Sequence, residues 1–220
     1  MMRICISFAA LFLPLTAPAL AETPRETLTM VAFGNLDKAS ALAATERAHL
    51  AAGRLDSRRE ALLMKAMATG YRAKLTNNRS EAVAARRAFE VAASSNPGDP
   101  EALASLGSWH ISAVTALGGM AARIALGAER AKGLEALGRS IALGGNRALF
   151  VGNAALLRVK LDGPTPEARR LAVLAASAPA PTALDRHMKD AAAKLLATWD
   201  NAGAVRTLAG RLLPLGRFEK

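Results

Sequence analysis

Apolar residues recur every three or four positions along most of this chain, the spacing that places them on one face of an α-helix. Short breaks rich in Gly, Pro or Asn separate these segments, and no segment shows the apolar–polar alternation of a half-buried strand. The pattern predicts an all-α protein in which short links join consecutive helices as antiparallel hairpins. The predicted helices cover residues 37–52, 57–75, 78–93, 100–117, 128–143, 147–160, 166–177, 182–199 and 202–212.

The best-defined helix boundary is the sequence NPGDPEAL. The turn at Asn96–Gly98 stops one helix. Asp99 is placed to cap the next helix, and Pro100 takes its first position, where a missing N–H costs nothing. Asn78 followed by Glu81 resembles a capping box, which predicts the start of the preceding helix.

Composition agrees with a single helical domain. The 220 residues are 51% hydrophobic but only 4% aromatic, and Ala and Leu supply most of the apolar side chains. Ala and Leu favour helices, whereas strands draw on β-branched and aromatic residues. The length suits one globular domain.

The first 21 residues have the pattern of a secretory signal peptide. Arg3 precedes an apolar run from Ile4 to Leu15, and small residues end the segment at Ala21. A membrane anchor is the competing interpretation, but the run is too short to span a bilayer and is interrupted by proline. We therefore predict cleavage after Ala21, which leaves one exported domain, residues 22–220, that is periplasmic or secreted and has no stable membrane insertion.

Cysteine usage narrows the chemistry further. Cys5 is the only cysteine, and it lies within the predicted signal peptide. The mature chain then has none, which excludes disulfides, thiolate metal sites and cysteine nucleophiles.

The chain is strongly basic, with a formal net charge of +11. Such an excess of basic residues is typical of proteins that bind polyanions. An exported protein, however, rarely encounters nucleic acid, and the arginines of this chain are scattered without aromatic residues between them. Two interpretations remain open: solvated helix faces, or an attraction for acidic proteins, anionic lipid headgroups or envelope polymers. We predict no nucleic-acid partner.

The stretch AFEVAASSNPGDPEALASLG carries small, aromatic, proline, leucine and glycine residues at spacings that resemble the junction between two tetratricopeptide repeats (TPRs). The later stretch KGLEALGRSIALGGN resembles the second helix of a repeat. Together the resemblance covers residues 82–146. The matching positions are Ala85, Phe89, Ala92 and Pro97 at the end of one repeat, Leu103, Leu106, Gly107 and His110 at the start of the next, and Gly133, Leu137 and Ser140 in its second helix.

The repeat contains an insertion. Between Gly107 and Gly133 the chain exceeds the TPR spacing by about 14 residues, placed around Gly118 and Gly119. The resemblance implies TPR-like antiparallel hairpins stacked into a short right-handed α-solenoid, because a single hairpin cannot bury its apolar face alone. Residues 147–220 form irregular C-terminal helices, and the terminal ones, such as those of residues 166–212, would then act as caps.

Four residues around the insertion form the candidate ligand or partner site. On a helical wheel His110 is central on an apolar arc, as a core imidazole or a ligand contact, and Trp109 lies at the border of that arc, as a core packer or a groove wall. Arg123 and Arg130 follow the glycine pair, where their guanidinium groups are either solvated or bind a carboxylate.

No motif indicates catalysis. The three histidines, His49, His110 and His187, lack the HxxxH or HExxH spacing of metal sites. No nucleophile or orienting acid accompanies His110, and the chain has no GxSxG, Walker or dinucleotide-binding motif. We therefore predict no catalytic residue, no metal site, no cofactor and no enzymatic activity.

The expected function is that of an exported TPR-like scaffold or adaptor that binds a protein or peptide, with arginines favouring an acidic partner. A concave surface formed by the first helices of the hairpins would hold the partner. The alternative is a small-ligand-binding accessory protein of a periplasmic solute transporter. A closed apolar pocket at Trp109 and His110 would favour the ligand, and an open groove would favour a protein or peptide. The sequence leaves the oligomeric state open.

Overall fold

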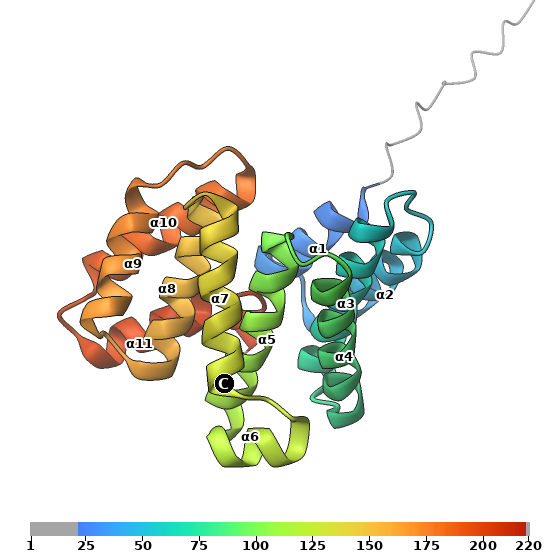
Figure 1. Cartoon of the computed structure of the whole chain (residues 1–220), viewed down its shortest axis with the longest axis horizontal. Helices are drawn as coiled ribbons and strands as arrows, with labels where there is room; N and C mark the ends of the chain where they lie inside the picture. Colours follow the sequence, from blue (N-terminus) through green and yellow to red (C-terminus); the bar gives the residue numbers. More distant parts are fainter. Residues whose placement is uncertain (1–21, 219–220) are drawn as a thin grey trace, which may run out of the picture.

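The computed structural model describes residues 22–218, so the predicted signal peptide lies outside the described residues. Within this range the chain forms eleven α-helices and one short 3₁₀ helix, which confirms the all-α class (Figure 1). The elements are α1 (Pro24–Phe33), α2 (Lys38–Ala52), α3 (Arg58–Thr76), α4 (Arg79–Ser95), α5 (Pro100–Leu117), α6 (Gly119–Leu126), α7 (Arg130–Gly144), α8 (Ala148–Asp162), α9 (Pro166–Ser177), α10 (Ala183–Ala197), α11 (Ala202–Leu212) and η1 (Gly216–Phe218). None of the described helices is both long and apolar enough to cross a bilayer.

The periodicity located most of these helices closely. The predicted ranges 100–117, 166–177 and 202–212 coincide with α5, α9 and α11. Helix α1 was not predicted, although Thr23 and Glu26 form a reciprocal capping box around Pro24 at its start. Helix α6 was predicted only as an apolar stretch.

The predicted caps also form. The Asp99 carboxylate accepts the Glu101 N–H at 3.0 Å, and Pro100 is the first residue of α5. Asn78 caps α4 by accepting the Glu81 N–H, but the Glu81 carboxylate is held by Arg72 of α3 instead of returning to Asn78. The capping box predicted there is therefore only half formed.

Consecutive helices pack as antiparallel hairpins, an arrangement consistent with an α-solenoid. The pairs are α1 with α2, α3 with α4, α5 with α7, and α8 with α9, and neighbouring first helices also contact one another. Helix α6 is inserted between α5 and α7 without separating them. Two glycines allow their close approach: a Cβ on Gly107 would lie 2.9 Å from the Gly133 carbonyl oxygen, and one on Gly133 would lie 2.7 Å from Ile111 Cδ1.

The C-terminal segment returns to the N-terminal helices. Helix α11 packs mainly on α8, and residues 213–218 then continue to α1 and α3. Leu215 is fully buried with Val31 and Leu75, and its N–H donates to the Ala32 carbonyl at 2.9 Å. Residues 213–218 thus cover part of α1 and α3, which are first helices of their hairpins.

Two further side chains strengthen the contact between the C-terminal helices and α1. The Arg217 guanidinium donates to the carbonyls of Val31 and Ala32, at the C-terminal end of α1, at 2.9 and 3.1 Å. From α1 itself, the Phe33 ring lies against the His187 ring of α10, with centroids 4.2 Å apart. The described chain is therefore held as one unit by contacts between its two ends.

Candidate functional site

Trp109 is half-buried on α5 and packs between two apolar clusters. On one side it touches the cluster that contains Phe89 of α4, and on the other the cluster of Val114 and Ala122 that anchors α6. Its ring meets the His110 ring edge-on, with centroids 5.1 Å apart. Trp109 is therefore a packing residue that attaches the insertion to the hairpins.

His110 is only 1% exposed. Its Nδ1 accepts the backbone N–H of Glu129 at 3.1 Å, which fixes the link between α6 and α7. Burial lowers the pKa of the imidazole, and the bond requires an unprotonated Nδ1. His110 is therefore a neutral, structural residue that fixes the end of the insertion to α5.

Acidification should destabilise the protein through this residue. Because the pKa of His110 is lowered in the folded state, the unfolded chain binds the proton more readily, and the free energy of unfolding falls as the pH drops below the ordinary histidine value of about 6.5. Urea unfolding at pH 7 and pH 5 measures the fall, which should be smaller in His110→Asn. An imidazole of His110 that titrates by NMR at or above the ordinary value would contradict this account.

The two candidate arginines do not join this pair in one site. Arg130, at the start of α7, donates to the Asp162 carboxylate of α8 at 2.9 Å and so ties neighbouring hairpins together. Arg123 is exposed on α6, and no ion pair holds it within residues 22–218. The structure buries His110 and half-buries Trp109 beside it, places Arg130 in a structural ion pair, and leaves Arg123 at the surface.

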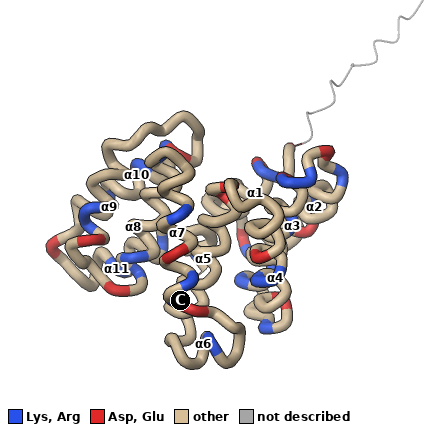
Figure 2. The backbone as a smooth tube through the Cα atoms, viewed as in Figure 1, with Lys and Arg blue, Asp and Glu red and all other residues tan. Residues whose placement is uncertain are grey.

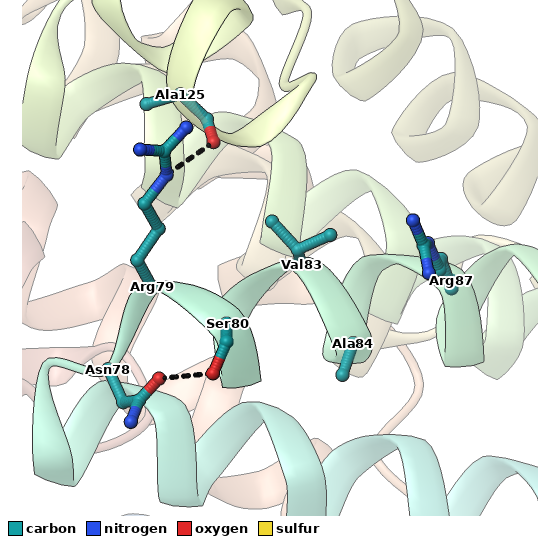
Figure 3. A pocket seen from close by; sticks show the side chains of 7 residues that line it. All are labelled: Asn78, Arg79, Ser80, Val83, Ala84, Arg87 and Ala125. Carbon is teal, nitrogen blue, oxygen red and sulfur yellow. Dashed lines mark hydrogen bonds between the residues drawn. The ribbon is translucent and has the colours of Figure 1, made fainter.

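A groove between α4 and α6 is the better candidate site. It has a volume of about 680 Å³, and its lining combines apolar and cationic side chains (Figure 3). Arg79 spans the groove at one end, where its Nε donates to the Ala125 carbonyl of α6 at 3.0 Å. The lining residues are Asn78, Arg79, Ser80, Val83, Ala84, Arg87 and Ala125.

Positive charge in this groove is not neutralised by nearby acids. Of the carboxylates on α4, that of Glu81 pairs with Arg72 and that of Glu90 with Arg86. Within the described chain, Arg87 has no carboxylate partner. Figure 2 shows Lys and Arg positions along α4 and on α6. The groove can therefore bind a carboxylate or phosphate through the Arg87 guanidinium and through the terminal nitrogens of Arg79, whose Nε is held by Ala125.

A second, smaller cavity of about 200 Å³ lies where α1, α3 and α5 meet. Its charged groups satisfy one another: Arg25 pairs with Glu60 and Glu101, and Arg59 pairs with Asp99. This cluster fastens three helices together and offers no free group to a ligand. Trp109 and His110 line neither cavity. In the part of the chain that the structure describes, no three potential metal-ligating side chains come together.

Sequence reasoning did not find the α4–α6 groove. Arg86 and Arg87 are adjacent in the sequence, and only the fold distinguishes them: Arg86 pairs with Glu90, whereas Arg87 lines the groove. The available signal was the four-residue spacing of Arg79, Val83 and Arg87, which puts them on one stripe of a helix.

Comparison with known proteins does not assign the chain to a family. No protein-family model matches the chain, and no curated protein is significantly similar to it.

Proposed function

We propose that this protein is an exported TPR-like adaptor that binds an acidic peptide or protein segment in the α4–α6 groove. The observation that carries the proposal is the pair of arginines, Arg79 and Arg87, on either side of Val83 in an open groove without a compensating carboxylate. The adaptor acts by recognition alone. Its location in the cell envelope rests on the predicted signal peptide.

The spacing of the lining residues suggests what fits. Arg79 and Arg87 are eight positions apart on α4, which corresponds to about 12 Å along the helix axis. An extended peptide advances about 3.3 Å per residue, so two acidic side chains about four residues apart reach both guanidinium groups. An apolar side chain between them meets Val83 at the floor of the groove. The preferred segment is therefore acidic, then apolar, then acidic.

The small-ligand alternative has less support. It required an apolar pocket around Trp109 and His110. Trp109 instead packs against two apolar clusters, and His110 is 1% exposed, with its Nδ1 hydrogen-bonded to the Glu129 N–H. Groove volume alone suits a small ligand, but the lining is open and lacks convergent buried polar groups. A protein segment fits this surface better.

Charge reversal in the groove should weaken binding of an acidic peptide. The probe is a fluorescent extended peptide with two Glu residues four positions apart and a Leu between them, compared with its Gln counterpart. Arg87→Glu should weaken binding of the Glu peptide at least tenfold, about 1.4 kcal/mol, because it replaces a charge-assisted contact with repulsion. Fluorescence anisotropy measures the affinities.

The matched control is Arg169→Glu, which makes the same charge change at an exposed position on α9. It should leave the affinity within about twofold, because the site is outside the groove and salt screens distant charges. Equal binding of the Glu and Gln peptides, or equal losses in the two variants, would overturn the proposal.

A further inference from the structure

Helix α6 presents an apolar face to solvent. Met120 and Ile124 are 80% and 77% exposed, the highest values among the large apolar side chains of the described residues. They are four positions apart, so they lie on the same face of the helix. Ala122, on the opposite face, is fully buried and holds α6 against α5. The exposed face is therefore not a defect of packing, because the helix is already anchored by its other side.

This face lies at the periphery of the molecule. Helix α6 stands at one edge and packs mainly against α5 and α4 (Figure 1). Leu117, 48% exposed, adds a third apolar side chain just before the helix, and every residue from Ala116 to Ala121 is exposed. We call the side chains of Leu117, Met120 and Ile124 the α6 tip.

The charge around the α6 tip is mainly positive. No Asp or Glu occurs between Glu101 and Glu129, whereas Arg123 stands between Met120 and Ile124 in the sequence. Arg79 and Arg87 of the adjacent α4 add positive charge, the carboxylates of α4 pair with Arg72 and Arg86, and that of Glu129, the acid next to Arg123, pairs with Lys132. A partner for this surface must therefore be anionic and must accept exposed apolar side chains.

We infer that the α6 tip docks the protein reversibly onto an anionic lipid bilayer. The three apolar side chains enter the headgroup region, while Arg123 contacts a lipid phosphate and the positive charge of α4 adds longer-range attraction to the anionic surface. A bilayer accepts a small exposed apolar patch. A stable protein interface needs about 800 Å² from each partner, more than is supplied by two side chains on an eight-residue helix and one at the end of α5. This inference goes beyond the adaptor role, since it assigns a second surface next to the groove.

Vesicle sedimentation tests this inference. The probe is the folded chain, residues 22–220, with phosphatidylcholine vesicles that either contain or lack phosphatidylglycerol. Binding should require phosphatidylglycerol and decrease with salt. The double variant Met120→Ser/Ile124→Ser should bind at least about tenfold more weakly, because it removes the apolar contribution. Since both side chains are exposed, its thermal unfolding should match that of the wild type.

The control is Leu50→Ser/Val173→Ser, which removes two apolar side chains of 62% and 53% exposure on α2 and α9. This variant should bind the vesicles as the wild type does. The inference fails if the wild type ignores phosphatidylglycerol, if the two double variants bind alike, or if the wild type is a dimer that the Met120→Ser/Ile124→Ser change dissociates. Binding of the acidic peptide by the same variant separates this outcome from failure of the groove proposal, because that binding should persist.

Discussion

Replacing Asp185 with alanine should lower the free energy of unfolding by roughly 2–4 kcal/mol, because it removes a buried carboxylate that pairs with the partly exposed Arg147 and accepts hydrogen bonds from Leu149 and Thr182. The Asp185 side chain is fully buried at the start of α10. One oxygen accepts from the Arg147 guanidinium at 2.6 Å and the other from the Leu149 N–H at 3.0 Å, so the carboxylate joins α10 to the start of α8. Its bonds with Thr182 also cap α10.

The pKa of Asp185 shows how well this carboxylate is supported. Burial by itself raises the pKa, but the hydrogen bonds from Arg147, Thr182 and Leu149 outweigh it and hold the pKa below the ordinary aspartate value. A carboxylate whose pKa is lowered by folding stabilises the fold at a pH above its pKa in the unfolded chain. This stabilisation is lost as the pH falls through its pKa in the folded protein. The loss caused by Asp185→Ala should therefore be full at neutral pH and shrink in strong acid.

Urea unfolding of Asp185→Ala against Asp190→Ala measures the effect. Asp190 is exposed on the same helix, so its removal should change the free energy of unfolding by no more than about 0.5 kcal/mol. Similar losses in the two variants would show that the buried network contributes little.

Replacing Leu215 with alanine should cost about 2–5 kcal/mol, the range for removal of a fully buried leucine. The side chain fills space among α1, α2 and α3, although it is only a few residues from the end of the described chain. The variant should also loosen α1, because Leu215 and Arg217 hold the backbone at its C-terminal end. Faster amide exchange in α1 than in α9 would report that local release.

The matched control for this substitution is Leu50→Ala, since Leu50 is 62% exposed on α2. It should change the free energy of unfolding by about 0.5 kcal/mol or less. If Leu215→Ala behaves like this control, the C-terminal segment is not a structural part of the fold.

The packing of the C-terminal segment against the N-terminal helices decides which surfaces can bind a partner. The surface shared by the first helices, on which the sequence suggested a concave binding site, carries α11 and residues 213–218. The groove and the α6 tip instead lie on α4 and α6, which the C-terminal segment leaves free. Helix α6 therefore contributes to both proposed binding surfaces, with Ala125 in the groove and Met120 and Ile124 in the α6 tip.

The helices could be predicted because their signals are local. Apolar spacing, Asp99 and Pro100 at the start of α5, and glycine breaks act within a few residues, so a single sequence displays them. Helix α1 was missed even though its capping box is visible at Thr23 and Glu26. The candidate site was harder to predict, because rare residues such as Trp109 and His110 draw attention wherever they lie. Here His110 is buried and Trp109 packs half-buried against the core.

By itself the sequence determined the helical class, most helix boundaries, the basic charge and the place of the insertion, since each depends on neighbouring residues. Only the tertiary structure decided which surfaces stay open. Arg79 meets Ala125 across a separation of 46 positions, and Arg217 meets Val31 across 186. Such contacts leave no periodic trace in the chain, because they depend on how whole helices pack and not on the spacing within any one of them.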